Sequence, residues 1–143
     1  MDLYACTSFP LSVVLFDLDG FKTVNDTYGH DTGDRLLALL SSIMKSILRE
    51  TDISFRQGGD EFCVLFQDTE QKYPLAVMER VLERFQKEQV KLIDKKDKVG
   101  FSGGCGCFLS TDRSSRNALA RADVLLYEAK KQAKGQILYA KSH

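Results

Sequence analysis

Two adjacent carboxylates, Asp60 and Glu61, follow a pair of glycines in the stretch RQGGDEF at residues 56–62. Apolar runs flank this stretch, and two apolar runs around a Gly-Gly tip are typical of a β-hairpin. A third carboxylate, Asp17, directly follows the apolar run LSVVLF at residues 11–16. If that run is a strand beside the hairpin, the acids converge at one edge of a sheet. Clustered carboxylate oxygens hold Mg²⁺ and leave coordination sites for phosphate oxygens.

Two features beside these acids favour a phosphorylated ligand. Gly58 and Gly59 would let a nucleotide approach the backbone, because a glycine has no Cβ to obstruct it. Residues 18–24 read as a turn that opens a helix, and the free N–H groups at a helix start bind phosphate.

Each of these pieces also has another interpretation when it is taken alone. The tip acids can be turn residues, and Asp17 can be a strand-end acid that caps the next helix. The string FDLDGF also suits phosphatases of the haloacid-dehalogenase-like family, which begin with an apolar strand and D-x-D-G. That family usually continues with Thr or Val, whereas Phe21 follows here, and the sequence has no later strand-end acidic pair of that kind.

Hydrophobic periodicity predicts the elements that must position these residues. A buried strand at 11–20 opens into a loop, and a short helix at 21–30 ends near Gly29. Asp31 is the expected N-cap of a second helix, whose apolar residues recur at helical spacing over 36–48. The remaining segments are predicted as hairpin strands at 52–57 and 61–66, an amphipathic helix at 70–90, a strand at 98–109, a helix at 117–134 and a last strand at 136–140.

The order β-α-α-β-β-α-β-α-β predicts an α+β fold, with a mixed sheet and helices packed on it. Glycines weaken the strand at 98–109 and indicate bulges or a close backbone approach. At 143 residues we expect a single domain, 1–143.

The bulk composition excludes several function classes. The 20 Lys and Arg balance the 20 Asp and Glu, which argues against a general nucleic-acid-binding protein. Cys63, Cys105 and Cys107 lie in apolar runs without a C-x-x-C pair, so we interpret them as small buried hydrophobes rather than zinc ligands. No apolar run approaches the roughly 18 residues of a membrane span, and the N-terminus lacks a signal-peptide pattern. We expect a soluble, cytoplasmic segment, which leaves room for a membrane-anchored parent protein.

The sequence resembles a known family at three ordered places. RQGGDEF contains the motif GGDEF, residues 16–34 (FDLDGFKTVNDTYGHDTGD) resemble a second signature, and residues 122–135 (ADVLLYEAKKQAKG) resemble a C-terminal helix. From about residue 12 to about 139, the chain is similar to the GGDEF domain of diguanylate cyclases, which join two GTP molecules into cyclic di-GMP. The resemblance implies a nucleotidyl-cyclase-like (palm/ferredoxin-like) fold with a mainly antiparallel central sheet flanked by helices.

The resemblance implies catalytic and metal-binding roles. Asp17 and Asp60 would hold Mg²⁺, or Mn²⁺ in its place, and the Leu18 carbonyl would add a ligand. Glu61 would be a further metal ligand or would handle the proton. Lys22 would neutralise the triphosphate where the reaction takes place.

The resemblance also implies a substrate site. Asn25 and Asp34 would recognise guanine, because a carboxylate accepts from guanine N1–H and N2–H together. His30 would lie near the base. The other implied substrate-binding residues are Gly58 and Gly59 along the nucleotide and Lys130 and Lys134 at the triphosphate. Asn25 can equally be a turn or cap residue, Asp34 a helix-start acid, and Lys130 part of a solvated helix face.

The implied reaction is phosphoryl transfer, in which the 3′-hydroxyl of one GTP attacks the α-phosphorus of the other and pyrophosphate leaves. Each domain would hold one GTP, so catalysis would require a homodimer. Arg49 and Asp52 fit R-x-x-D, with five residues between Asp52 and Gly58, and this spacing implies an inhibitory site for the product. Without that spacing, an ordinary ion pair at a helix end is the alternative. A sensor domain is expected elsewhere in the full-length protein.

Two departures from the family pattern bear on activity. The segment D-x-L-T-G-L-x-N-R-R of the usual first helix has no counterpart in residues 1–11, so we expect that helix to be absent or truncated. In the C-terminal pattern K-x-x-G-R-N, Ala133 and Lys134 replace Gly and Arg, and Lys lacks the bidentate fork of Arg. The alternative function is a catalytically silent module that binds GTP or cyclic di-GMP in a signalling protein.

Overall fold

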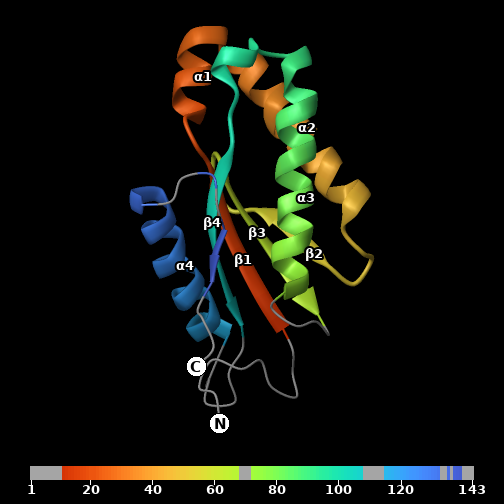
Figure 1. Ribbon diagram of the computed structural model, residues 1–143, viewed down its shortest axis with the longest axis vertical. Coiled ribbons are helices and arrows are strands. Elements are labelled where there is room, and N and C mark those ends of the chain that lie inside the picture. The colour runs from red at the N-terminus through yellow and green to blue at the C-terminus, as the bar shows by residue number, and fades with distance from the viewer. Residues whose placement is uncertain (1–10, 68–71, 108–114, 133–134, 136, 140–143) are drawn as a thin grey trace.

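The computed structural model describes residues 11–67, 72–107, 115–132, 135 and 137–139. A sheet of five strands forms its centre, in the order β2-β3-β1-β4-β5 (Figure 1). The elements are β1 (Leu11–Leu18), α1 (Phe21–Tyr28), α2 (His30–Ile47), β2 (Ile53–Arg56), β3 (Glu61–Gln67), α3 (Lys72–Glu88), the short 3-10 helices η1 (Gln89–Lys91) and η2 (Lys95–Asp97), β4 (Phe101–Cys107), α4 (Ser115–Gln132) and β5 (Ile137–Tyr139). The predicted order of helices and strands is confirmed.

The sheet is mixed and mainly antiparallel, as expected. β1 pairs antiparallel with both β3 and β4, and β2 pairs antiparallel with β3. The short β5 is parallel to β4. β2 and β3 flank the glycine pair, so the predicted hairpin is confirmed.

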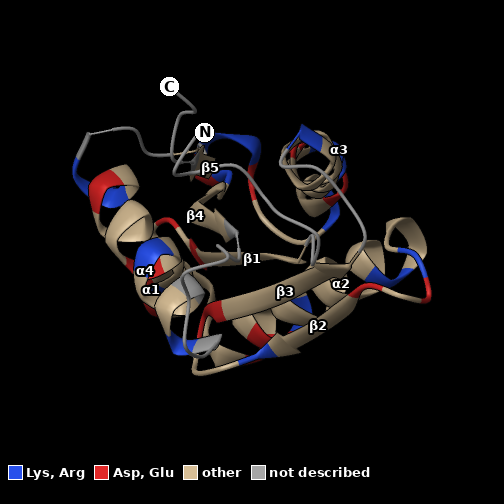
Figure 2. Ribbon diagram, turned by 90° about the horizontal axis from the view of Figure 1, so that it is seen from below, with Lys and Arg blue, Asp and Glu red and all other residues tan. Residues whose placement is uncertain are grey.

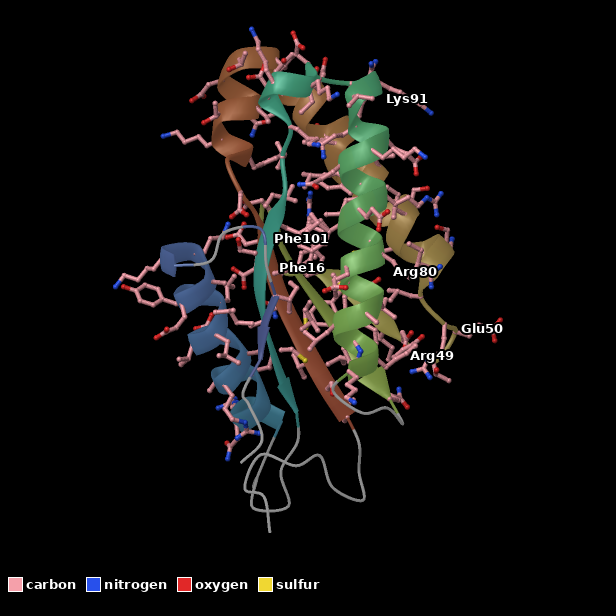
Figure 3. All side chains as sticks on the ribbon, viewed as in Figure 1. Phe16, Arg49, Glu50, Arg80, Lys91 and Phe101 are labelled. Carbon is pink, nitrogen blue, oxygen red and sulfur yellow. The ribbon has the colours of Figure 1, made fainter. Side chains whose placement is uncertain are left out.

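Helices cover the two faces of the sheet with different cores. Alternate residues of a strand point to opposite faces, and in β1 Val14 and Phe16 join the large core beneath α2 and α3, while Val13 and Leu15 pack toward α4. Figure 2 shows α4 and α3 on opposite sides of the sheet. Phe16 and Phe101 lie between the sheet and α3, with ring centroids 4.6 Å apart (Figure 3).

Two glycines of β4 lie where the chain is closely packed, and Gly104 is the one that allows α4 to approach the sheet. A Cβ on Gly104 would fall against the Ala122 carbonyl and within 2.6 Å of Leu125 Cβ. A Cβ on Gly103 would lie 2.7 Å from Phe16 Cβ. The interpretation of these glycines as sites of close backbone approach is therefore confirmed.

The second helix starts differently from the expectation. Gly29, with φ 91°, precedes α2, so Asp31 lies inside the first turn and is not the N-cap. The Gly29 N–H bonds to the Asn25 carbonyl at 2.9 Å, and the Gly29 carbonyl accepts from the Gly33 N–H at 3.2 Å. One glycine thus closes α1 and opens α2, because its left-handed φ reverses the chain in a single residue.

Other expectations concern the surface and the N-terminus. Among the described residues, no helix combines the length and apolar character needed to cross a bilayer. Cys63 and Cys105 are buried and unoxidised, as expected, whereas the side chain of Cys107 is outside the described part. The expectation about the first helix concerns residues that include 1–10, which also lie outside it.

Candidate active site

The acids of β1 and the hairpin meet at one edge of the sheet. The register of the β1–β3 ladder places Asp17 opposite Glu61. The Leu18 N–H donates to the Asp60 carbonyl at 3.2 Å, and the Gln57 N–H donates to the Glu61 carbonyl at 2.9 Å to close the hairpin. Antiparallel pairing brings the end of β1 and the start of β3 together, so the predicted convergence of the acids is confirmed.

The carboxyl of Asp17 has a strongly raised pKa. Burial raises its pKa to about 7, helped by a hydrogen bond with the Asp60 carboxyl and by the charges of Asp60 and Glu61, while Lys130 opposes the rise. Its Oδ1 atom is buried and has no hydrogen-bond partner within the described residues. Lys130 compensates this carboxyl only in part, since the pKa stays raised, and a bound cation would supply further positive charge.

Lys130 reaches this edge from α4. Its Nζ donates to Asp19 Oδ1 at 2.7 Å and to the carbonyls of Leu18 and Asp17 at 3.2 and 3.3 Å. It also lies 3.9 Å from Asp17 Oδ2. Sequence reasoning gave Asp19 no role, although its place two residues after Asp17 could have suggested one. The structure makes it the main partner of Lys130.

The predicted base-recognition residues lie on α1 and α2. Asn25 is half-buried, and its Oδ1 is buried without a hydrogen-bond partner in the part of the chain that is described. A Cβ on Gly33 would overlap that oxygen and lie 3.2 Å from Phe21 Cζ, so Gly33 is what allows Asn25 to pack against α2. The remaining residues assigned to substrate on these two helices are exposed: Lys22, His30 and Asp34.

The glycines of the hairpin tip are exposed and are not required by the fold. Neither Gly58 nor Gly59 has a left-handed φ, and a Cβ on either would meet no atom within 4 Å. An approaching ligand is therefore a better reason for glycine here than local geometry.

The predicted product-site residues contact each other. Arg49 donates from Nη2 to Asp52 Oδ1 at 2.9 Å and from Nε to Asp52 Oδ2 at 3.3 Å. The Arg49 N–H also donates to Asp52 Oδ2, at 2.9 Å, and the Asp52 side chain is 0% exposed. Arg49 further donates to the Gln67 carbonyl and lies over the Tyr73 ring, 4.4 Å from its centroid. A pocket of about 510 Å³ adjoins this pair. Figure 3 shows Arg49 at the loop after α2.

The chemistry of the donor set at the sheet edge fits a hard divalent cation. No group of three or more His, Cys, Asp or Glu side chains is arranged to hold a metal within the described residues. The expected ligands are Asp17, Asp60 and Glu61 with the Leu18 carbonyl, so these three acids do not form such a group. Mg²⁺ typically takes few protein ligands and completes its shell with water and phosphate, so a pair of carboxylates with one carbonyl suits it. Lys134, assigned to the triphosphate, lies outside the described residues.

Comparisons with known proteins agree with this geometry. The profile of the family described as diguanylate cyclase, GGDEF domain, matches residues 3–136. Diguanylate cyclase A of Treponema denticola is 34% identical over 93% of this chain and 36% of its own length. Cyclic di-GMP phosphodiesterase NbdA of Pseudomonas aeruginosa is 34% identical over 84% of this chain and 15% of its own.

A solved structure shares the fold closely. The active GGEEF domain of a diguanylate cyclase from Vibrio cholerae superposes with a TM-score of 0.84 at 27% identity, over 93% of this chain and 85% of that one. The chain spans about a third or less of the length of the two curated relatives. The matching profile, the two signatures and the shared sheet show that this chain belongs to the GGDEF domain family of diguanylate cyclases.

Proposed function

We propose that this chain is the catalytic domain of a diguanylate cyclase, which condenses two GTP molecules into cyclic di-GMP. The observation that carries the proposal is the buried Oδ1 of Asp17, which has no hydrogen-bond partner among the described residues and lies beside the Asp60 carboxyl, just before α1. A site of this kind suits a cation that bridges the protein and a phosphate.

The reaction is two successive phosphoryl transfers. The 3′-hydroxyl oxygen of one GTP bonds to the α-phosphorus of the other, the bond from that phosphorus to the β-phosphate bridging oxygen breaks, and pyrophosphate leaves. The second transfer closes the ring and releases a second pyrophosphate. Glu61, which lies opposite Asp17 in the ladder, would receive the hydroxyl proton or serve as a further metal ligand.

The residues of the site divide the binding tasks between them. Asp17, Asp60 and the Leu18 carbonyl would hold Mg²⁺, or Mn²⁺ in its place. When bound, that ion would withdraw charge from the reacting phosphate and favour the ionised 3′-hydroxyl. Asn25 would bind the guanine edge from α1, and Asp34 from α2. Three further assignments complete the site: the cations Lys22, Lys130 and Lys134 at the triphosphate, Gly58 and Gly59 along the nucleotide, and His30 near the base.

Catalysis requires two copies of the domain, because each holds one GTP and the two α-phosphates must meet the opposing hydroxyls. Activity per protomer should therefore rise with protein concentration below the dimer dissociation constant. A sensor domain in the full-length protein would control this encounter, and the catalytic segment would work in the cytoplasm.

Product inhibition is proposed at Arg49 and Asp52. Both Asp52 oxygens already accept from Arg49, so cyclic di-GMP must exchange those bonds for its own. We therefore expect weak inhibition by the product, and the variant Arg49→Ala should abolish it without lowering the maximal rate.

The deciding experiment incubates concentrated protein with GTP and Mg²⁺ and identifies the products by mass spectrometry. Wild type should form cyclic di-GMP, and Asp60→Ala should form none. Asp123→Ala removes an exposed acid of α4 from outside the site and is the matched control, expected to match wild type. Full activity in Asp60→Ala would contradict the metal assignment.

A second candidate is a module that binds GTP or cyclic di-GMP without turnover. The relationship to NbdA favours it, because this region also occurs in a protein named for a phosphodiesterase activity. Tight nucleotide binding without product, in a dimer verified by light scattering and carrying the native flanking sequence, would establish this candidate and exclude the cyclase.

A further inference from the structure

A hydrogen-bonded network joins four parts of the chain behind the acidic edge. Ser102 lies on β4, opposite Asp17 in the ladder, and is 0% exposed. Its hydroxyl donates to Asp19 Oδ2 at 2.7 Å. The Gly135 N–H donates to the same hydroxyl at 2.8 Å and to Asp19 Oδ2 at 3.1 Å. The roles implied by the family resemblance use none of these three residues.

The network fixes both oxygens of the Asp19 carboxylate. Oδ2 accepts from Ser102 and Gly135, which sets the plane of the carboxylate and leaves Oδ1 directed at Lys130 Nζ, 2.7 Å away. A short hydrogen bond between charged groups is stronger than one between neutral groups. Ser102 therefore acts on Lys130 through Asp19.

Lys130 depends on such a partner for a defined position. Its four-carbon stem has large rotamer freedom, and ordering a lysine side chain costs up to roughly 2 kcal/mol of entropy. Asp19 and the Leu18 and Asp17 carbonyls together give its ammonium three acceptors. With Asp19 free to rotate, the ammonium would lose its shortest contact and the direction in which it faces the acidic edge.

Gly135 ties the segment after α4 into the same network. Its φ of +82° is left-handed, which strains any residue other than glycine, and its N–H faces Ser102 and Asp19 as a result. The network thus joins β4, α4 and a residue between α4 and β5 around one carboxylate, which directly follows β1.

We propose that Ser102 and Asp19 are positioning residues that hold Lys130 ready for the phosphates of the nucleotide. This inference rests on the proposed function, since it assigns GTP to the acidic edge. It goes further in stating that a buried serine governs affinity for the phosphate chain and has no effect on affinity for the base.

The structural alternative is that Ser102 only satisfies a buried N–H. The two ideas differ in which ligand is affected. Titration calorimetry with Mg²⁺ would compare guanosine with 3′-deoxy-GTP, which carries the triphosphate and lacks the attacking hydroxyl. Ser102→Ala should lower the affinity for 3′-deoxy-GTP about tenfold, which is the effect of one hydrogen bond to a charged group. The affinity for guanosine should stay unchanged.

The chain offers a matched control and a rescue. Ser12 is also a buried serine of the sheet, but its Oγ has no hydrogen-bond partner in the described part of the chain, so Ser12→Ala should change neither affinity. Ser102→Thr keeps the hydroxyl and should restore binding of 3′-deoxy-GTP. If Ser102→Ala does not fold, Asp19→Asn keeps the shape, removes the charge and should show the same selective loss.

A double-mutant cycle completes the test. In a Lys130→Gln background, Ser102→Ala should cause no further loss of 3′-deoxy-GTP affinity, because Ser102 acts through Lys130. Three results would overturn this inference and leave the proposed function standing. Ser102→Ala could weaken the binding of both ligands equally, it could leave the affinity for 3′-deoxy-GTP unchanged, or its effect could add to that of Lys130→Gln. Failure of wild type to bind 3′-deoxy-GTP at all would overturn the proposed function, and the inference with it.

Discussion

Replacing Gly33 by alanine should weaken GTP binding while nearly sparing stability. The new methyl group would overlap Asn25 Oδ1, the far end of a flexible side chain, and would press on Phe21 Cζ at 3.2 Å. That oxygen is buried without a partner in the described residues, so rotating the amide toward water relieves an unpaired acceptor. We expect the Asn25 side chain to rotate, while the helices α1 and α2 keep their positions.

The magnitudes separate stability from binding. Alanine in a helix interior is favoured over glycine by about 1 kcal/mol, and overpacking costs about 1–3 kcal/mol when the surroundings do not yield. Because Asn25 yields, the free energy of unfolding should change by less than about 1 kcal/mol. Losing one or two hydrogen bonds of Asn25 to guanine costs about 1–2 kcal/mol, which corresponds to a rise in KM of roughly 5- to 30-fold.

Steady-state kinetics and thermal unfolding of four proteins provide the assay: wild type, Gly33→Ala, Asn25→Ala and the double variant. Gly33→Ala should raise KM for GTP with little change in kcat, as expected when binding is lost equally from the ground state and the transition state. In the Asn25→Ala background the added methyl group no longer overlaps the amide and keeps only the 3.2 Å contact with Phe21 Cζ, so Gly33→Ala should leave KM unchanged and raise the melting temperature.

Two results would refute this reasoning. One is a KM within twofold of wild type for Gly33→Ala when Asn25→Ala raises it clearly. The other is an equal rise in KM from Gly33→Ala in both backgrounds, which would show that Gly33 acts without Asn25.

Three further predictions concern groups whose surroundings are set by the fold. Gln89→Leu should lower the free energy of unfolding by about 3 kcal/mol. The buried Gln89 amide donates to the Val99 carbonyl at 2.8 Å and accepts from the Val99 N–H at 2.6 Å, and chemical denaturation measures the loss of both bonds. In buffer with a chelator, stability should fall as pH rises from about 4 to 7, because the Asp17 pKa is about 7 in the folded chain against an ordinary 3.8, so the folded state binds the extra proton in that window. Cys63 and Cys105 should resist iodoacetamide at pH 8 until denaturant is added, since both are buried and burial raises the pKa of the Cys63 thiol to about 11; peptide mapping detects the labels.

Each of these three predictions has a control variant or a result that would contradict it. Arg84→Ala breaks an exposed ion pair near Gln89 and should cost less than about 1 kcal/mol, and an equal cost for the two variants would contradict the role of the amide. Asp17→Asn should flatten the pH profile, so an unchanged slope would assign it to another group. Labelling of Cys63 in native protein at the rate found in denaturant would contradict its burial.

Local patterns predicted the parts of the site that depend on neighbouring strands. The alternation in β1 and the glycine pair of the hairpin identify two antiparallel strands, and antiparallel pairing then forces Asp17 toward Asp60 and Glu61. The start of α2 was predicted wrongly: capping preferences favour Asp31 as the N-cap, whereas the N-cap is Gly29. Only the backbone reveals the positive φ of Gly29 that sets this start.

The remaining contacts depend on tertiary geometry that no single segment encodes. Asp19 meets Ser102 because of the β1–β4 register, and it meets Lys130 because Gly104 of β4 lets α4 approach the sheet. The R-x-x-D spacing singled out Arg49 and Asp52 as a product site, which stays a prediction, and it could not reveal that the two residues bind each other in the folded chain.

The central place of β1 has a consequence for how such an enzyme can be regulated. Asp17 belongs to a strand held by antiparallel ladders on both sides, and a slip of one residue in either ladder would turn every side chain to the wrong face. The proposed metal-binding carboxylate therefore belongs to a strand that is held in register from both sides. If the domain acts as the proposed dimeric cyclase, a control signal that leaves the fold intact would change how often and in which orientation two copies meet, while the half-site of each copy stays assembled.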